Sequence, residues 1–387
     1  MLSLAGLAIA VVGIELYLRS RVPPSFAVSE ATIGYVLAPQ HAQTIPVVEH
    51  TNGDVVRRTN NLGLRRDSDT AVDKPPGTCR ILLLGDSQTE GVVNNAETYA
   101  ARLEQGERER GAANVEILNA AVSGYSPLLE YLWLRERGLR LRPDAIIVAL
   151  YTGNDVAELL MRHEDFGGLG PRFAIPFLVR DGGEWHVEPP GADLGLAGGV
   201  DWWLQTRLRA YVLARRAVLG PAREVRDATA RVAAECAGCL QTMWQAAMAD
   251  GDPKRLDDGF AKLDYLLGQF HAIAVGLRIP LLVAVIPTKI EVEGATVAQY
   301  VEHAATILGL HYDAAAFDDA VRERMLALAA QNGLQTVDLL PALRAAADAH
   351  GRAQYWSVDW HLNPEGHQVI AEQLAPSIAS LCAARLR

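Results

Sequence analysis

The hydrophobic pattern beyond about residue 79 alternates between short apolar runs and segments with helical spacing. The apolar runs cover residues 81–84, 115–118 and 145–150. The helical segments between them cover residues 97–110 and 127–140. Short apolar runs are typical of strands that are buried on both faces of a sheet. The alternation of strand and helix therefore predicts a parallel sheet with helices on both faces.

Residues 160–255 interrupt this alternation, and we interpret them as an insertion. Within them, two strand-like runs flank Asp181-Gly182, which predicts a β-hairpin, and residues 201–250 have helical character. The α/β pattern then returns with predicted elements at residues 257–276, 280–286, 313–332, 336–339 and 365–381. The expected fold is a three-layer α/β/α sandwich with a flavodoxin-like parallel sheet of about five strands. This domain is expected to cover residues 79–387.

The first 21 residues differ from everything that follows. Met1 to Leu18 are almost wholly apolar, and Arg19 and Arg21 follow before a Pro-Pro pair. The apolar stretch is at the short end for a membrane-spanning helix, which needs about 20 residues. A helix buried in the core is the alternative. Because the stretch is terminal and ends at a proline-rich break, we favour a membrane anchor, followed by a linker and lead-in segment over residues 22–78.

Composition and charge exclude some classes of function. The chain has 36 basic and 46 acidic residues and a net charge of −10. An acidic chain without a basic cluster has little electrostatic reason to bind nucleic acid. Cys236 and Cys239 have the spacing of a redox or metal pair, but no second Cys or His pair of zinc spacing lies nearby. Two small residues in an Ala-rich helix are the favoured interpretation, a disulfide between them stays open, and no metal or other cofactor is expected.

The first predicted strand runs directly into Gly85-Asp86-Ser87. A serine at the carboxyl end of a parallel strand lies where open α/β sheets bind their ligands. Ser87 is therefore a candidate nucleophile. The structural alternative is that Asp86 or Ser87 only caps the helix that follows.

Two uncharged donors follow the next two predicted strands. Gly124 lies in the loop after the second strand, and Asn154 comes directly after the third. A backbone N–H and a side-chain amide stabilise a developing oxyanion without delivering a proton. The structural alternatives are a turn glycine and a capping asparagine.

A candidate base precedes the last predicted helix. Serine needs an adjacent base, and histidine suits this role because its ordinary pKa is about 6.5. Asp359 and His361 are close enough in sequence for one loop to present both. A carboxylate on the second ring nitrogen would orient the imidazole. His367 falls in the first turn of the helix, where a packing or helix-dipole role is favoured.

Taken in order, these segments resemble the SGNH hydrolases, a family of GDSL-like esterases and lipases. The four marker residues of that family match Ser87, Gly124, Asn154 and His361. The resemblance implies that Ser87 is the nucleophile and that the Ser87 N–H, the Gly124 N–H and the Asn154 side chain form the oxyanion hole. It also implies that His361 is the base and that Asp359 orients it.

The resemblance covers residues 80–160 and about 257–381. Residues 60–65 look like a motif that precedes the catalytic domain in membrane-anchored bacterial members. Residues 287–289 look like a segment of the branch related to polysaccharide O-acetylation. Two features depart from the family: the acid and base are spaced Asp-x-His where many members have Asp-x-x-His, and the insertion has no counterpart.

The sequence therefore predicts a serine-dependent ester hydrolase that acts on an O-acyl or O-acetyl group of a cell-envelope carbohydrate. The alternatives are an O-acetyltransferase acting on a polysaccharide and a non-catalytic sugar-binding protein on the same fold. By the positive-inside rule, Arg19 and Arg21 would hold the main domain in the cytoplasm, but two charges weigh little. We expect a membrane-anchored protein whose catalytic domain lies outside the cytoplasm, in the periplasm.

Overall fold

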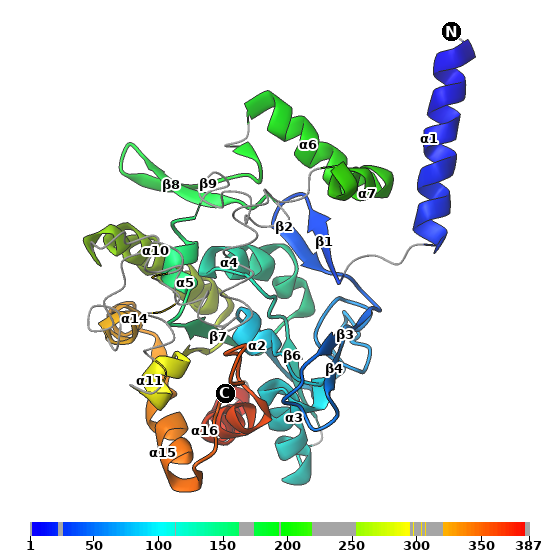
Figure 1. Cartoon of the computed structure of the whole chain (residues 1–387). Coiled ribbons are helices and arrows are strands. Elements are labelled where there is room, and N and C mark those ends of the chain that lie inside the picture. The colour runs from blue at the N-terminus through cyan, green and yellow to red at the C-terminus, as the bar shows by residue number, and fades with distance from the viewer. Residues whose placement is uncertain are drawn as a thin grey trace.

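The centre of the molecule is a five-stranded parallel sheet (Figure 1). The computed structural model describes residues 2–21, 26–112, 114–161, 174–192, 195–218, 253–294, 297, 303, 306 and 320–383. The strands are β5 (Cys79–Leu84), β6 (Val115–Asn119), β7 (Ala145–Tyr151), β10 (Leu281–Ile286) and β11 (Gln335–Asp338). Their order across the sheet is β6-β5-β7-β10-β11, which is the flavodoxin order. The predicted fold class is confirmed.

Two hydrophobic cores lie on opposite faces of the sheet, because successive side chains of a strand alternate between the faces. In β5, Leu82 and Leu84 belong to the first core, and Ile81 and Leu83 belong to the second. The first core is covered by α4 (Pro127–Glu136), α10 (Asp257–Leu277) and α14 (Ala320–Gln331). The second is covered by α3 (Tyr99–Glu109), α15 (Leu340–His350) and α16 (Pro364–Ala383). Figure 1 shows α4 and α10 on one side of the sheet and α3 and α16 on the other, so the fold has three layers.

Short helical turns complete the part of the sandwich that the structure describes. They are α2 (Ser87–Glu90), α5 (Asp155–Glu158), α11 (Lys289–Glu293) and the 3-10 turns Asn95–Glu97, Gly138–Leu141 and Pro253–Leu256. Of these, α2 follows the buried strand β5 and begins with Ser87, and α5 follows the buried strand β7 and has Asn154 as its N-cap.

Residues 27–58, within the predicted linker and lead-in segment, contain two antiparallel strand pairs. β1 (Ala27–Glu30) pairs with β2 (Gly34–Leu37), and β3 (Ala42–Pro46) pairs with β4 (Asp54–Arg58), both in antiparallel fashion. Ile33 and Leu64 are fully buried in the first core. The strands are only four or five residues long. Such short strands show too little periodicity to be recognised in the sequence.

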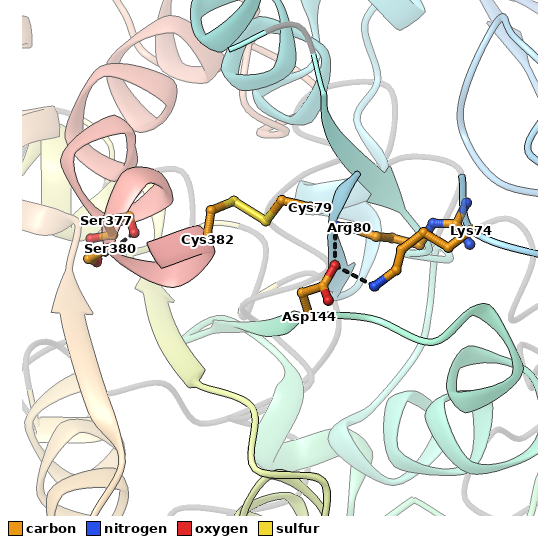
Figure 2. The surroundings of a disulfide bond; sticks show 7 residues. All are labelled: Lys74, Cys79, Arg80, Asp144, Ser377, Ser380 and Cys382. Carbon is orange, nitrogen blue, oxygen red and sulfur yellow. Dashed lines mark hydrogen bonds and ion pairs between the residues drawn. A yellow bond between two sulfur atoms is a disulfide. The ribbon is translucent and has the colours of Figure 1, made fainter. Parts of the chain in front are cut away.

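A disulfide joins Cys79, the first residue of β5, to Cys382 in the last turn of α16 (Figure 2). The two Cα atoms are 5.7 Å apart, although the cysteines are separated by 303 residues. Beside the disulfide, the Asp144 carboxylate accepts the Arg80 N–H at 2.8 Å and pairs with Lys74 at 2.5 Å. The bond thus ties the start of β5 to the end of the last helix.

The insertion predicted at residues 160–255 is described in part. Its described elements are β8 (Phe177–Asp181), β9 (Glu184–Glu188), α6 (Gly195–Arg207) and α7 (Arg209–Val218). β8 and β9 form the antiparallel hairpin that the Asp-Gly turn predicts. The hairpin packs on α10 through Trp185 and Tyr265, whose ring centroids are 6.1 Å apart. Cys236 and Cys239 lie outside the described residues.

The N-terminal stretch forms one helix, α1 (Leu2–Arg21), which contacts α7 (Figure 1). The Glu15 carboxylate accepts the N–H groups of Arg209 at 3.0 Å and Ala210 at 3.1 Å. These two N–H groups open α7 and have no acceptor inside that helix, so Glu15 caps it. A membrane anchor is the sequence prediction for this stretch. Within the part of the chain that the structure describes, no helix is long and apolar enough to cross a membrane.

Candidate active site

The carboxyl ends of three neighbouring strands carry the first three predicted site segments. Ser87 follows β5, the loop of Gly124 follows β6, and Asn154 follows β7. In the sheet, β6 lies next to β5 on one side, and β7, the next strand along the chain, lies next to β5 on the other side. The boundary between β5 and β7 is therefore the topological switch point, where open α/β sheets bind their ligands.

Ser87 is the first residue of α2, and its neighbour Asp86 caps that turn. Asp86 Oδ1 accepts the Gln88 N–H at 2.9 Å, as an N-cap carboxylate does. Of the two capping residues that the sequence allows, the structure thus uses Asp86. Only 7% of Ser87 is exposed. Capping of α2 therefore does not explain the serine at position 87.

Asp359 and His361 are in contact through their side chains. Asp359 Oδ1 hydrogen bonds to His361 Nδ1 and also accepts the His361 backbone N–H at 3.3 Å. Burial raises the pKa of Asp359, but the charge and hydrogen bonds of His361 outweigh it, so that pKa lies below its usual value. Burial lowers the pKa of His361, but Asp359, with help from Asp86, outweighs it, so that pKa lies above its usual value. A carboxylate on Nδ1 leaves Nε2 to accept a proton, which is the arrangement of a general base.

The residue between the acid and the base has an unusual backbone conformation. Trp360 lies in the left-handed region, with φ of +63°. This region costs a residue with a side chain about 1–2 kcal/mol, so neighbouring contacts must hold it there. Trp360 is almost fully buried, and its Nε1–H donates to Ser357 O at 3.0 Å. The Trp356 N–H donates to His361 O at 2.9 Å. The short Asp-x-His spacing is thus accommodated by a left-handed residue, Trp360, in a loop that these hydrogen bonds stabilise.

The loop that carries Asp359, Trp360 and His361, here called the base loop, lies against the turn that begins at Ser87. Gln88, which is fully buried, accepts the Leu362 N–H at 2.9 Å and donates to Trp360 O at 3.3 Å. Trp360 and Leu362 are the residues on either side of His361. The structure therefore brings together the segments of the predicted nucleophile and base, although Gln88 and Trp360 are 272 residues apart in sequence.

The Gly124 loop is held beside the same turn. Gly124 has φ of +77°, and a Cβ at this position would lie 2.8 Å from the Tyr35 hydroxyl. The residue before it, Ser123, donates its N–H at 2.7 Å and its hydroxyl at 2.6 Å to Glu90 Oε2. The Tyr35 hydroxyl donates to Ser123 O at 2.9 Å. Both the backbone conformation and the close contact therefore require glycine here.

Asn154 is buried at the start of α5, beside the residue that precedes Ser87. Its Nδ2 donates to Glu158 Oε1 at 3.0 Å. Burial raises the pKa of Asp86 to about 6, although the hydrogen bond from the Gln88 N–H, the charge of His361 and the nearby Asn154 side chain lower it. The Asn154 amide thus lies near Asp86 and is oriented by the carboxyl group of Glu158.

Three further acids lie behind these residues, and the sequence pattern did not single them out. Glu130 and Asp155 are buried, and Glu158 is half-buried with a buried carboxyl oxygen. Burial, followed by the charge of Asp86, raises the pKa of each carboxyl group well above its usual value. The raised pKa favours the protonated, uncharged form of each carboxyl group near the candidate oxyanion donors. Among the described residues, no group of three or more His, Cys, Asp or Glu side chains is arranged to hold a metal ion.

The N-terminal hairpins reach the site and brace α2. Arg57 of β4 pairs with the buried Glu90 carboxylate at 2.8 Å. The buried Arg65 guanidinium donates to the backbone oxygens of Glu90 at 3.2 Å, Gly91 at 3.2 Å and Val93 at 2.8 Å. Arg65 ends the Asn-Asn-Leu-Gly-Leu-Arg motif of the sequence. The motif therefore supports the loop that follows α2, the turn of the candidate nucleophile Ser87.

His367, the second histidine of the C-terminal motif, has a packing role. Its fully buried ring stacks on Tyr99 with centroids 5.6 Å apart, and its Nδ1 accepts the Tyr99 N–H at 3.3 Å. Burial lowers the pKa of His367 to about 3, so the ring is neutral at physiological pH. This packing position agrees with the role that its place in the first turn of α16 favours.

The fold defines a class: a three-layer α/β protein with flavodoxin strand order, carrying serine, histidine and aspartate near the switch point. No family profile matches the chain, and no curated protein matches it. Solved structures do match, among them several esterases and a related hydrolase. They include LAE5, an α/β hydrolase enzyme from the metagenome of Lake Arreo, Spain, at 14% identity and a TM-score of 0.38, covering 78% of this chain and 96% of that chain.

Two further structural neighbours act on acetylated polysaccharides. A catalytic mutant of Axe2, an acetylxylan esterase from Geobacillus stearothermophilus, matches at 11% identity and a TM-score of 0.39, covering 79% of this chain and 96% of that one. A two-domain esterase active on acetylated mannans matches at 10% identity and a TM-score of 0.37, covering 79% of this chain and 50% of that one. The function proposed below rests on the residues of this chain.

Proposed function

We propose that the chain is a serine-dependent ester hydrolase that removes O-acyl groups, O-acetyl groups foremost, from a carbohydrate. Ser87 is the nucleophile, His361 is the general base and Asp359 orients the base. The observation that carries the proposal is the contact of Asp359 with His361 Nδ1, in a loop that Gln88 binds to the turn of Ser87. Serine needs such a base because it is a weak nucleophile at neutral pH.

In the first half-reaction, Ser87 Oγ attacks the carbonyl carbon of the ester while its proton passes to His361 Nε2. Asp359 stabilises the imidazolium that forms. The tetrahedral intermediate then collapses, and the sugar hydroxyl leaves with the proton from His361. In the second half-reaction, water gives a proton to His361 and attacks the acyl carbon. The carboxylic acid leaves, and the proton returns to Ser87.

Three donors stabilise the oxyanion in this proposal. The Ser87 N–H is the first of α2 and has no acceptor inside that turn. The Gly124 N–H and the Asn154 amide complete the set, and one such donor is worth about 10²–10³-fold in turnover. Glu158 engages the Asn154 amide at 3.0 Å, and an amide nitrogen carries two hydrogens. The raised pKa of Glu158 suits this position, because it favours the uncharged carboxyl group, and a carboxylate anion would oppose the oxyanion.

The carbohydrate part of the proposal is supported by residues 287–289, which resemble the O-acetylation branch and border the base loop. Lys289 Nζ donates to Trp356 O at 3.2 Å. We also propose that the catalytic domain lies outside the cytoplasm, in the periplasm, because the disulfide of Cys79 and Cys382 suits an oxidising compartment. Anchoring of the protein to the membrane by residues 1–21 stays a prediction.

The decisive experiment is covalent labelling of the full chain with a fluorophosphonate probe, followed by mass-spectrometric assignment of the labelled residue. We expect the label on Ser87, and we expect Ser87→Ala to abolish both labelling and acetate release from acetylated oligosaccharides. Ser380→Ala, at an exposed position near the end of α16, is the matched control and should behave as the unchanged protein. Full activity of Ser87→Ala would refute the esterase proposal.

The same acyl-enzyme could pass its acyl group to a sugar hydroxyl instead of water. Acetate release is therefore measured with and without an unacetylated oligosaccharide acceptor. Free acetate as the main product in both cases supports the hydrolase. Acetylation of the acceptor in place of acetate release would make the protein a transferase. Sugar binding without labelling or turnover would make it a non-catalytic binding protein.

A further inference from the structure

Gln88 is a fully buried polar residue that the proposed chemistry does not use. It follows the candidate nucleophile directly and lies inside α2. A buried amide is costly unless its donor and acceptor groups are hydrogen bonded. The groups to which Gln88 is bonded therefore indicate why a glutamine stands beside Ser87.

Two of its hydrogen bonds flank the candidate base. Gln88 Oε1 accepts the Leu362 N–H at 2.9 Å, and Gln88 Nε2 donates to Trp360 O at 3.3 Å. One amide plane thus binds the backbone before and after His361. Two bonds from one planar group fix both the distance and the orientation of the bound backbone, which a single bond would not do.

The backbone that Gln88 holds is the strained part of the loop. Trp360 has φ of +63°, a conformation that a residue with a side chain keeps only when its surroundings impose it. This conformation lies between Asp359 and His361, so a relaxation of Trp360 would change the angle between the two side chains. Gln88 is bonded to the carbonyl of that same residue.

We propose that Gln88 is a positioning residue, which holds the left-handed turn of Trp360 and thereby places His361 against both Asp359 and Ser87. The inference rests on the proposed function, because it concerns the geometry of the same acid, base and nucleophile. Gln88 itself touches neither the substrate nor the transferred proton. It links the nucleophile turn and the base loop into one unit, so that the spacing of serine and histidine does not depend on the loop alone.

The test substitutes Gln88→Met, which keeps the length and bulk of the side chain and removes both hydrogen bonds. We expect turnover of an acetyl ester to fall about 10–100-fold, because a displacement of about 1 Å in a catalytic group can cost about 10²-fold. KM should change less than about twofold, since no substrate contact is removed. The rate of fluorophosphonate labelling should fall by the same factor as turnover.

The matched control is Gln354→Met. Gln354 is also a buried glutamine, and its Nε2 donates to a backbone carbonyl, that of Arg352, at 2.8 Å. It lies in the same C-terminal loop region, and its side chain is bonded away from His361, whereas its backbone oxygen, which the substitution keeps, accepts the Asn363 N–H at 3.1 Å. Its substitution should change thermal stability about as much as Gln88→Met and should leave turnover within about twofold of the unchanged protein. Equal losses of turnover in the two variants would reduce Gln88 to a packing role.

Two spectroscopic measurements separate this inference from the esterase proposal. In the unchanged protein, proton NMR should show a strongly downfield signal from the Nδ1 proton of His361, and Gln88→Met should weaken or lose it. The backbone N–H of Leu362 should exchange slowly with solvent in the unchanged protein. This measurement does not depend on whether any variant folds. Rapid exchange of that N–H, or an unchanged NMR signal in Gln88→Met, overturns the positioning role even if Ser87 proves to be the nucleophile.

Discussion

The disulfide between Cys79 and Cys382 makes a quantitative prediction, because it closes almost the entire sandwich into one loop. The cysteines are separated by 303 residues. If a cross-link acts only by lowering the entropy of the unfolded chain, a loop of that length raises the free energy of the unfolded state by about 5–6 kcal/mol. Measured stabilisation by disulfides is typically about 2–4 kcal/mol. Reduction of the bond should therefore lower the free energy of unfolding by about 2–5 kcal/mol.

The assay is urea unfolding of the oxidised and the reduced protein, followed by tryptophan fluorescence. Comparison of the same chain with and without dithiothreitol changes no side chain other than cysteine. Cys79→Ser/Cys382→Ser should unfold like the reduced protein and should show no response to dithiothreitol. Cys236→Ser/Cys239→Ser is the control and should keep the full response.

An unchanged unfolding midpoint after complete reduction would refute the assignment of a stabilising role to this bond. So would a response to dithiothreitol that follows Cys236 and Cys239 instead. Thiol counting with and without reductant shows independently whether Cys79 and Cys382 are oxidised in the purified protein. Oxidation in protein taken from its native compartment would also support the proposed location outside the cytoplasm.

Four further predictions concern the site. Activity should fall as pH drops through the raised pKa of His361, with a midpoint above about 6.5 in a kcat/KM profile, because the protonated ring cannot accept the serine proton. Asp359→Asn should move that midpoint to lower pH, since Asp359 is the main group that raises the pKa of His361; an unmoved midpoint contradicts the pairing. Gly124→Ala should reduce turnover at least tenfold, because the new Cβ meets the Tyr35 hydroxyl at 2.8 Å. Gly183→Ala is the control: its φ is also positive, at +94°, but nothing lies within 4 Å of the new Cβ, so it should lower stability and leave turnover unchanged. His367→Ala should lower thermal stability and retain the acid midpoint of the pH profile; loss of that midpoint would make His367 the base.

The sandwich was predictable from the sequence because each central strand is buried on both faces. The runs at residues 81–84 and 145–150 appear in the structure as β5 and β7, extended by one or two residues. The same reasoning missed α15, which directly follows β11 after Leu339 and is rich in alanine. It also missed the N-terminal hairpins, whose strands β3 and β4 are only five residues long; β3 exposes alternate residues, and β4 does not. Short elements that are stabilised by tertiary contacts show no periodicity of their own.

The site was predictable to the extent that its groups follow buried strands. Parallel strands bring their carboxyl ends to one edge, so the order of Ser87, Gly124 and Asn154 along the chain implied that they lie near one another. The acids Glu130 and Glu158 could not be found in this way. Each is one polar residue in a helix, and only the packing of that helix shows that its carboxyl group faces the site and not solvent.

The least predictable feature is that the single turn α2 joins the separate parts of the site. Gln88 binds the base loop, and Glu90, two residues later, binds the loop of Gly124 through Ser123. Successive residues of a helical turn point about 100° apart, so residues two apart face nearly opposite sides and can hold two separate loops. Arg57, from the N-terminal hairpins, completes this arrangement by neutralising the buried carboxylate of Glu90. The residues before the sandwich are therefore part of the candidate active site. Removal of Arg57 would leave the buried Glu90 carboxylate without its nearest cationic partner.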